Sequence, residues 1–516
     1  MKRRKFIKTT GAALSVPLVL NGLNVQGMPK SSLFSNMNET DKILVLIRLN
    51  GGNDGLNMVI PRDQYLGLNA VRSNIILPEN TVLPLTDTVG LHSQMTTLQN
   101  VYNDGQLGVV QAVGYPNQNR SHFRSTDIWT SGSPANEFWT TGWLGRNFEM
   151  DHPEFPTDYP NDDYPDPFAL TIGNTVSQTC QGSTSNFSMT LNDPFTLMPL
   201  TEGAESELPD NYYGEELSFL RVAIRQSNAY GDTITAAANL GTNAVDYPED
   251  NALAAKLKTV ALLIAGGLQT KVYVIDLGGF DTHANQVTAD DPTVGNHAEL
   301  MKTLSDAIGA FQADLNAQAL DERVIGMTFS EFGRRIRSNE SLGTDHGTAG
   351  PLFLFGSCVS SAILGNNPEI SAEATAGEGV PMQYDFRDIY GSILKDWFLL
   401  DDTKIRSLLY EDYTHLPILE NCTVGTEDKR EEINIQMNTY PNPVRNILNV
   451  DFESSGAWVK LSIYDVIGSE VKVVFNQKLS KGKHQVQVDM HDLPAGSYYC
   501  RLQIGAAQKT KRIVRG

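Results

Sequence analysis

Two acid–imidazole pairs in the sequence combine residue types that bind metal ions. Asp281 and His283 are two residues apart, and Asp345 and His346 are adjacent. Both pairs lie among glycines, which let a loop turn so that neighbouring side chains face one ion. Carboxylate oxygen and imidazole nitrogen together suit zinc, manganese, iron or magnesium better than a soft metal. These four residues are therefore candidate metal ligands.

Three more residues could complete such a site. Asp54 adds an acidic group at the end of a predicted strand, and His297 begins a predicted helix from which it could reach back to the same site. The two acid–imidazole pairs and Asp54 make three such groups, which could hold two ions about 4 Å apart. At this separation the attacking and leaving oxygens are both stabilised. A nearby ion would lower the pKa of a hydroxyl group, so Ser121 is the candidate nucleophile.

Each candidate also has a purely structural interpretation. A single Asp-His pair in a loop is usually part of a turn or cap, and Asp54 could support the turn beside it. Ser121 could cap a helix that begins at His122. Glu331 and Arg334 could form a surface pair on one helix. The shared site is favoured because all these residues follow predicted strands.

The elements that would position these residues are strands alternating with helices. Four apolar runs predict buried strands, at residues 42–49, 107–113, 271–277 and 323–329. Apolar residues at helical spacing predict helices, at residues 215–227, 251–265, 296–319 and 387–399. This order predicts an α/β fold with a mainly parallel sheet flanked by helices.

Ligands of such sheets bind beyond the carboxyl ends of the strands. The polar residues that follow the apolar runs are therefore candidate substrate-binding residues, namely Asn53, Arg120, His122, Glu331 and Arg334.

Composition excludes several classes of protein. The 516 residues contain 40 Lys and Arg against 60 Asp and Glu, a net charge of −20 that argues against a nucleic-acid surface. No apolar run is long enough for a transmembrane segment. The four cysteines form no Cys-x-x-Cys pair, so neither a disulfide scaffold nor a thiolate zinc site is expected. The end of the chain is instead basic, which suggests a separate module.

The first residues predict an export signal, at residues 1–29. Arg3 and Arg4 lie in a charged start that precedes a short, weakly apolar run. This segment resembles a twin-arginine signal, and an ordinary signal for the Sec translocon is the alternative.

Residues 434–516 alternate apolar and polar residues in short runs separated by turns, which predicts a small all-β sandwich. Three motifs mark this segment: Tyr440-Pro441-Asn442-Pro443, Tyr464-Asp465-Val466-Ile467-Gly468 and Leu493-Pro494-Ala495-Gly496-Ser497-Tyr498. With them it resembles the type A C-terminal sorting domain of the type IX secretion system of Bacteroidetes; a carbohydrate-binding or immunoglobulin-like module is the alternative. The resemblance implies passage through the periplasm and a secreted or cell-surface location. Residues 423–433 are the predicted linker.

Residues 42–422 form the predicted α/β domain. Its most specific motifs are Asn50-Gly51-Gly52-Asn53-Asp54-Gly55, Arg120-Ser121-His122-Phe123, Gly279-Phe280-Asp281-Thr282-His283, Ser330-Glu331-Phe332-Gly333-Arg334 and Gly343-Thr344-Asp345-His346-Gly347. As a set they resemble the sulfatase-related domain-of-unknown-function family 1501, which is grouped with the alkaline-phosphatase-like fold. That superfamily places a Ser, Thr or formylglycine nucleophile between two metal sites.

The resemblance implies roles for individual residues. Asp54, Asp345 and His346 resemble the ligands of one ion, and Asp281 and His283 those of the other. The Cys-x-Pro-x-Arg sulfatase signature is absent, so a formylglycine is not expected.

The sequence therefore predicts an exported hydrolase of sulfate or phosphate esters that uses a divalent metal. The resemblance implies two ions, which could be zinc, manganese, calcium or magnesium, and a small-molecule or glycan ester as substrate. The alternative is a non-catalytic cell-surface binding protein that keeps the hydrolase fold. Export would involve the type IX machinery and the twin-arginine or Sec translocon.

Overall fold

The chain consists of two compact units, Met1–Cys422 and Thr423–Gly516. The computed structural model describes residues 41–200, 209, 211–419, 437–454, 458–464, 470–494, 496–504 and 507–516. The predicted export signal and the predicted linker lie outside these residues.

A buried strand, β1 (Ile43–Asn50), lies at the centre of the main sheet of the first unit. It pairs in parallel with β8 (Val272–Gly278) on one side and with β9 (Val324–Phe329) on the other. Beyond β8, the sheet continues in parallel with β6 (Ala169–Ile172) and β7 (Ser188–Leu191). The carboxyl ends of β1, β8 and β9 therefore meet at one edge of the sheet.

The other half of the sheet contains one reversed strand. β10 (Gly350–Phe355) is antiparallel both to β9 and to β5 (Leu107–Gly114), so β5 again runs in the direction of β1. The short strands β11 (Ile363–Leu364) and β12 (Tyr384–Asp385) pair in parallel with β5. The predicted mainly parallel sheet is thus confirmed.

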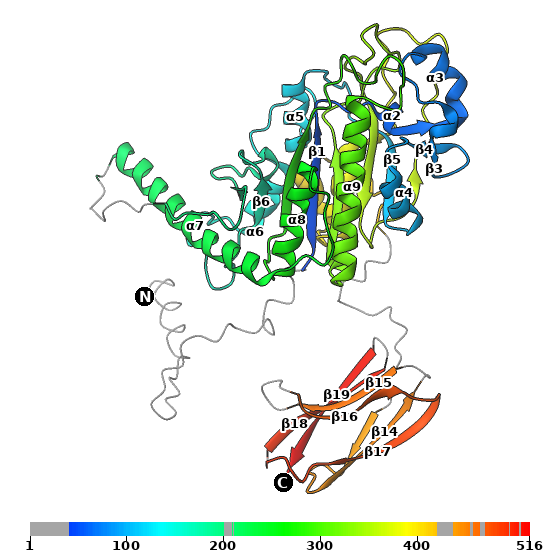
Figure 1. Cartoon of the computed structure of the whole chain (residues 1–516). Helices are drawn as coiled ribbons and strands as arrows, with labels where there is room; N and C mark the ends of the chain where they lie inside the picture. The colour runs from blue at the N-terminus through cyan, green and yellow to red at the C-terminus, as the bar shows by residue number, and fades with distance from the viewer. Residues whose placement is uncertain are drawn as a thin grey trace. The chain divides into compact units, whose positions relative to one another are not determined.

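Helices cover both faces of the sheet (Figure 1). Alternate residues of β1 enter two different cores: Val45 and Ile47 pack on one face, and Leu44 and Leu46 pack on the other. The first core includes α4 (Thr96–Asn103), α8 (Ala252–Ala265) and α9 (Asn296–Ala317). The second core includes α5 (His122–Ser131), α6 (Trp143–Asp151), α10 (Phe386–Asp396) and α11 (Asp402–Leu408). Burial on both faces explains why β1 is apolar along its whole length.

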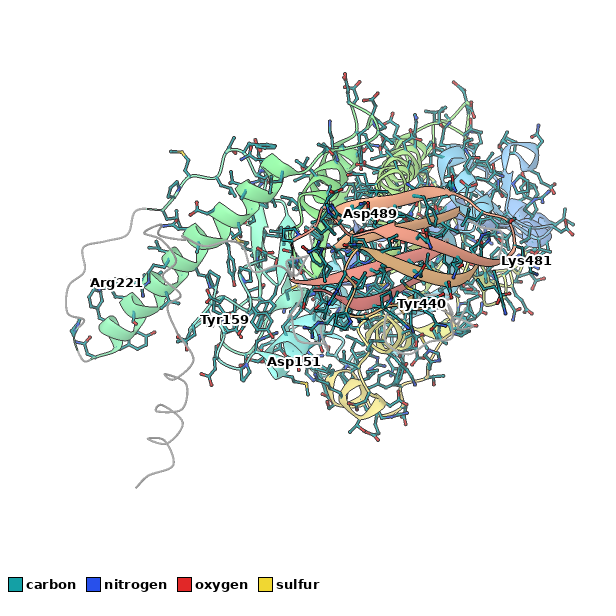
Figure 2. The ribbon with its side chains drawn as sticks, turned by 90° about the horizontal axis from the view of Figure 1, so that it is seen from below. Asp151, Tyr159, Arg221, Tyr440, Lys481 and Asp489 are labelled. Carbon is teal, nitrogen blue, oxygen red and sulfur yellow. The ribbon has the colours of Figure 1, made fainter. Side chains whose placement is uncertain are left out.

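The remaining elements of this unit lie outside the main sheet. They are α2 (Gly55–Met58), β2 (Val59–Pro61), α3 (Tyr65–Arg72), β3 (Leu83–Pro84), β4 (Val89–Leu91), α7 (Tyr212–Leu240) and four 3-10 turns, Arg62–Gln64, Glu79–Thr81, Gln178–Cys180 and Asp321–Arg323. Strands β2, β4 and β3 form a small antiparallel sheet. Helix α7 is longer than predicted, and the part that carries Arg221 projects from the unit (Figure 2).

The second unit is built from two antiparallel sheets that share one core. Its strands are β13 (Met437–Tyr440), β14 (Ile447–Ser454), β15 (Trp458–Tyr464), β16 (Glu470–Lys478), β17 (Gly482–Asp489), β18 (Gly496–Ile504) and β19 (Ala507–Arg515). The sheet orders are β13-β14-β17 and β16-β15-β18-β19. Val450 from the first sheet and Leu461 from the second are both fully buried in the shared core, which confirms the predicted β-sandwich.

Three cysteines lie within the described residues, and all are buried: Cys180, Cys358 and Cys500. Burial raises the pKa of both Cys180 and Cys500 to about 12. Among the described helices, none combines the length and the apolar character needed to span a membrane.

Candidate metal centre

The loops that follow β1, β8 and β9 approach one another closely at the carboxyl edge of the sheet. Gly51 follows β1 with φ +129°, and a Cβ atom at this position would lie 2.3 Å from the backbone nitrogen of Asp281. Only glycine leaves room for that approach. A parallel bridge between Asn53 and Gly333 joins the end of β1 to the loop after β9. The backbone therefore brings the predicted polar loops together.

One carboxylate oxygen, Asp281 Oδ1, lies at the centre of this edge. It is 2.9 Å from His283 Nδ1, 3.3 Å from His346 Nε2 and 3.5 Å from His122 Nε2. Arg334 Nη2 donates to the same oxygen at 2.6 Å. Within the described part of the chain, the residues whose ligand atoms all lie within 4.8 Å of one another are His122, Asp281 and His346. Three residues from separate segments of the chain thus form a candidate metal site.

Hydrogen bonds determine which ring nitrogen is protonated in two of these imidazoles, those of His122 and His346. His122 Nδ1 lies 2.8 Å from Oε1 of Glu331, whose side chain is 1% exposed and which also accepts the Gly51 N–H. His346 Nδ1 lies 2.8 Å from the carbonyl oxygen of Arg120. A carboxylate and a carbonyl only accept, so Nδ1 donates in both rings. In the neutral rings, Nε2 then presents a lone pair to Asp281.

Two lone pairs aimed at one carboxylate oxygen repel it unless a proton or a cation lies between them. Burial lowers the pKa of His346 and so disfavours the proton. Burial alone would raise the pKa of Asp281, but the hydrogen bond and charge of Arg334 outweigh it and lower that pKa, so the carboxylate is ionised at neutral pH. Imidazole and carboxylate donors fit zinc or manganese, and a metal-bound histidine commonly donates its other N–H to a carboxylate or carbonyl. The residues present therefore fit a divalent ion.

The predicted ligands Asp54 and His297 have other partners. Asp54 is fully buried, and its two oxygens lie 3.1 and 3.0 Å from Arg72 Nη1. Gln286 also donates to Oδ2 of Asp54 at 2.6 Å. Burial raises the pKa of Asp54, but the charge of Arg72 and further partners lower it overall. An arginine thus neutralises this carboxylate, where an ion was expected to do so.

His297 is 1% exposed, and its Nε2 lies 3.1 Å from Oδ1 of Asn53. Burial lowers the pKa of His297 to about 4. Because both side chains have these other partners, we assign neither His297 nor Asp54 to the ion.

One of the four residues in the two predicted pairs, Asp345, has other partners. Asp345 does not face Asp281: its Oδ2 is 3.0 Å from Arg335 Nη1, and its Oδ1 is 3.3 Å from Asn339 Nδ2. His283 stays at the site, because its Nδ1 lies beside Asp281 Oδ1. Of the four residues in the two pairs, three therefore gather and Asp345 stabilises the loop.

Ser121 immediately precedes α5, and its side chain makes no hydrogen bond to the helix. Its backbone N–H donates to Oδ1 of Asn119 at 2.8 Å. The residue is exposed, so its hydroxyl is accessible next to His122. Ser121 thus occupies the position of a helix cap without making the capping bond, and a role in chemistry remains open to it.

Burial divides the predicted substrate-binding residues into two groups. Asn53, Glu331 and Arg334 are between 1% and 3% exposed and cannot contact a substrate directly. The guanidinium of Arg334 donates to the carbonyl oxygens of Gly52, Thr344, Phe280 and Gly51 and to Asp281. It therefore supports the site from behind. Arg120 and His122 are only partly buried and remain accessible.

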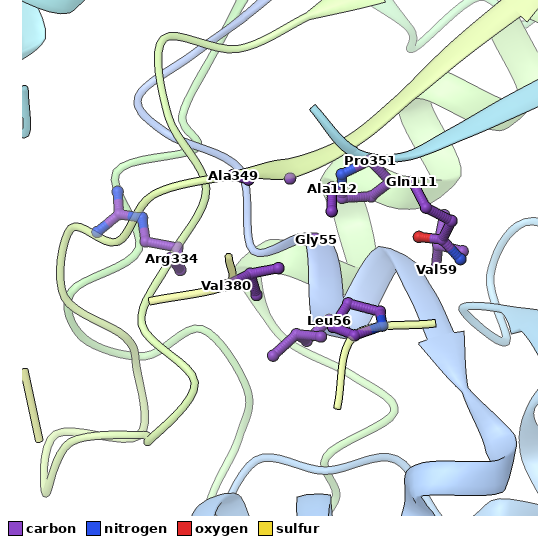
Figure 3. Close-up of a pocket in the computed structure, with 11 residues that line it drawn as sticks. Gly55, Leu56, Val59, Gln111, Ala112, Arg334, Ala349, Pro351 and Val380 are labelled. Carbon is purple, nitrogen blue, oxygen red and sulfur yellow. The ribbon is translucent and has the colours of Figure 1, made fainter. Parts of the chain in front are cut away.

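A small cavity lies near this support, lined by Gly55, Leu56, Val59, Gln111, Ala112, Arg334, Ala349, Gly350, Pro351, Pro368 and Val380 (Figure 3). Its volume of about 10 Å³ is close to the minimum for one water molecule. The Arg334 guanidinium points away from it in Figure 3. This cavity is therefore too small to hold a substrate.

Comparison with known proteins assigns both units. Residues 80–397, more than half of the chain, match the model of a family described as protein of unknown function DUF1501. The chain belongs to this family. Residues 438–515 match the secretion system C-terminal sorting domain. This match indicates handling by a type IX secretion system and a secreted or cell-surface location. None of the curated proteins compared with the chain matches it.

Solved structures give distant likenesses to this DUF1501 protein. A sulfatase from a Pseudoalteromonas species is 11% identical, with TM-score 0.32, 87% of this chain and 84% of that chain covered. A member of the alkaline phosphatase superfamily from Vibrio parahaemolyticus is 11% identical, with TM-score 0.31 and coverage of 88% and 85%. A lipoteichoic acid synthase from Listeria monocytogenes is 10% identical, with TM-score 0.30 and coverage of 70% and 73%. Likenesses at these TM-scores carry no argument about activity.

Sequence reasoning assigned two residues of the centre to other roles. His122 was expected to bind substrate. Its position after β5 was the available signal for a ligand, because the other candidate ligands also follow strands of the sheet. Glu331 was also expected at the substrate, but it acts on the His122 ring. Its burial and its partner follow from tertiary contacts that no spacing reveals.

Proposed function

We propose that the first unit is a metal-dependent hydrolase of sulfate or phosphate esters. Its ion would be held by Nε2 of His122, a carboxylate oxygen of Asp281 and Nε2 of His346. The observation that carries the proposal is the direction of these two nitrogens: hydrogen bonds at Nδ1 leave both lone pairs facing one carboxylate oxygen. That arrangement is stable when a cation neutralises it.

The surrounding residues have distinct roles in this proposal. Glu331 and the Arg120 carbonyl orient the two imidazoles, and Arg334 holds Asp281 in place. A bound divalent ion would act as a Lewis acid on the ester and lower the pKa of a nearby hydroxyl or water. Ser121 is the proposed nucleophile, because its hydroxyl makes no bond to α5. The Arg120 guanidinium attracts an anionic substrate.

The geometry supports one ion per chain. The described residues contain one group of three candidate ligands, and Asp54 and Asp345 each contact an arginine. We therefore propose a single site, in place of the two ions that the family resemblance implied.

Metal analysis of the purified full chain tests the proposal. We expect close to one zinc or manganese ion per chain, and loss of it in Asp281→Asn and His346→Ala. His415→Ala is the matched control, because His415 also contacts a carboxylate, Asp396 Oδ2 at 2.8 Å, away from the centre. Turnover of 4-nitrophenyl sulfate and 4-nitrophenyl phosphate should require the ion.

Replacement of Ser121 separates the two parts of the proposal. Ser121→Ala should keep the metal and lose turnover, since a nucleophile is not a ligand. A wild-type chain without bound metal after incubation with zinc and manganese would contradict the metal site. Bound metal without turnover of either ester would favour the second candidate, a non-catalytic cell-surface binding protein. That candidate is supported by the small size of the one group of candidate ligands among the described residues.

The sorting domain supports the cellular part of the proposal. We propose that the chain crosses the inner membrane through the twin-arginine or Sec translocon and the outer membrane through the type IX machinery. A small-molecule or glycan ester would then meet the enzyme outside the cell.

A further inference from the structure

Two partly buried arginines, Arg120 and Arg335, contact His346. The carbonyl oxygen of Arg120 accepts from His346 Nδ1 at 2.8 Å. Arg335 Nε lies 3.3 Å from the carbonyl oxygen of His346. Both residues therefore contact the same proposed ligand, Arg120 at its ring and Arg335 at its carbonyl oxygen.

The two guanidinium groups lie close to each other. Arg120 Nη1 donates to the carbonyl oxygen of Gly377 at 3.0 Å, and Arg335 Nη1 donates to that of Ala376 at 3.0 Å. Gly377 and Ala376 are consecutive, and consecutive Cα atoms are about 3.8 Å apart. Two like charges are thus held by the carbonyl groups of consecutive residues.

This pair of charges is only half neutralised. Arg335 contacts the Asp345 carboxylate at 3.0 Å. Around Arg120, no carboxylate of the described residues lies within 4.0 Å, and the groups that accept from it and from Arg335 include neutral carbonyls. Guanidinium N–H groups bind sulfate, phosphate and carboxylate in forked pairs. One net positive charge therefore remains available to an anion.

We infer that Arg120 and Arg335 form an anion subsite beside the proposed metal centre, and that the substrate carries a second anionic group besides the ester that reacts. This inference rests on the proposed function. The subsite would accept a sulfate, phosphate or carboxylate group and would thereby select polyanionic esters over singly charged ones. The Ala376 and Gly377 carbonyls occupy these donors until the anion replaces them.

Sulfate binding by the full chain tests the subsite. Calorimetric titration with sodium sulfate, against sodium chloride at equal ionic strength, is performed on chelator-treated and zinc-loaded protein. We expect one sulfate per chain without metal and a second one with it. Arg120→Gln and Arg335→Gln should each weaken the metal-independent binding about tenfold or more, because each removes a charged hydrogen-bond donor. The sulfate affinities of Arg120→Lys and Arg335→Lys should lie between those of the wild type and of the Gln variants, since lysine keeps the charge but not the forked pair of N–H donors.

Arg337→Gln is the matched control. Arg337 Nε donates to the Ala374 carbonyl at 2.9 Å, so it anchors the same loop by the same kind of bond. Its replacement should leave sulfate binding unchanged. Circular dichroism of each variant without sulfate shows that the fold is kept.

Three results would overturn the subsite. The first is the absence of sulfate binding to protein without metal. The second is unchanged sulfate affinity in the Arg120→Gln Arg335→Gln double variant. The third is a stoichiometry of one sulfate in zinc-loaded protein whose binding requires both the ion and the arginines. Failure of the proposed function gives a different result, because metal content is measured separately. Sulfate binding with no metal uptake would reject the hydrolase and keep the anion site.

Discussion

Replacing Glu331 tests whether a buried carboxylate sets the metal affinity through His122. Oε1 of Glu331 accepts both from His122 Nδ1 at 2.8 Å and from the Gly51 N–H at 2.9 Å. Glu331→Gln can keep both bonds through its amide oxygen and removes only the charge. Glu331→Ala removes both bonds, frees the His122 ring and leaves the Gly51 N–H unpaired in a buried place.

The expected magnitude follows from these contacts. Loss of a hydrogen-bond partner behind a metal-bound histidine typically costs about 10- to 100-fold in affinity, or about 1.4–2.8 kcal/mol. We expect Glu331→Gln near the lower limit and Glu331→Ala at or beyond the upper limit, because the alanine also leaves the ring orientation unfixed. Competition with a chromophoric chelator measures both dissociation constants.

A matched control distinguishes this effect from a general change of charge. Glu299 is exposed in the first turn of α9, so Glu299→Gln should leave zinc affinity unchanged. Wild-type affinity in both Glu331 variants, with the fold intact by circular dichroism, would refute the role of Glu331 in orienting His122. Equal losses in the two variants would show that charge alone matters.

Three further predictions concern stability and processing. Arg72→Met should destabilise the first unit by about 3–5 kcal/mol in urea unfolding, because it leaves the Asp54 carboxylate buried without its cation. The double variant Asp54→Asn Arg72→Met should recover part of this stability, and a double variant as unstable as Arg72→Met would reject the explanation. The pKa of Asp54 is lowered below 3.8, so this pair should stabilise the unit fully above that pH and lose its effect as pH falls through the folded-state pKa, measurable as a smaller Arg72→Met effect in acid. The mature surface protein should lack about eighty C-terminal residues by mass spectrometry, since residues 438–515 are a sorting domain and form their own core; an intact Gly516 would contradict this.

The strands around the site could be predicted because burial on both faces leaves a clear pattern. β1, β5, β8 and β9 coincide with apolar runs to within one or two residues at each end. Parallel strands place their carboxyl ends at one edge, and this was enough to bring Asp281, His283 and His346 together. The short strands β6 and β7 were not predicted, since four residues carry too little pattern.

The partners of the charged residues could not be predicted, because they come from distant parts of the chain. Asp54 contacts Arg72, which is 18 residues away on α3. Glu331 contacts His122 across 209 residues. A carboxylate that follows a strand has the same charge and the same place in the sequence whether it is a metal ligand, a member of a buried ion pair or a hydrogen-bond acceptor. The sequence alone therefore could not separate these roles.

The state of the cysteines determines how the protein can be handled. Thiolate is the reactive form of cysteine, and a pKa near 12 leaves about one thiol in 100,000 ionised at pH 7 for Cys180 and Cys500. These buried side chains are therefore poor partners for disulfide exchange and for alkylating reagents. Neither of them requires an oxidising compartment or a disulfide isomerase to reach its native state. Reducing agents can accordingly be present during production in a cytoplasm without unfolding the cores that contain them.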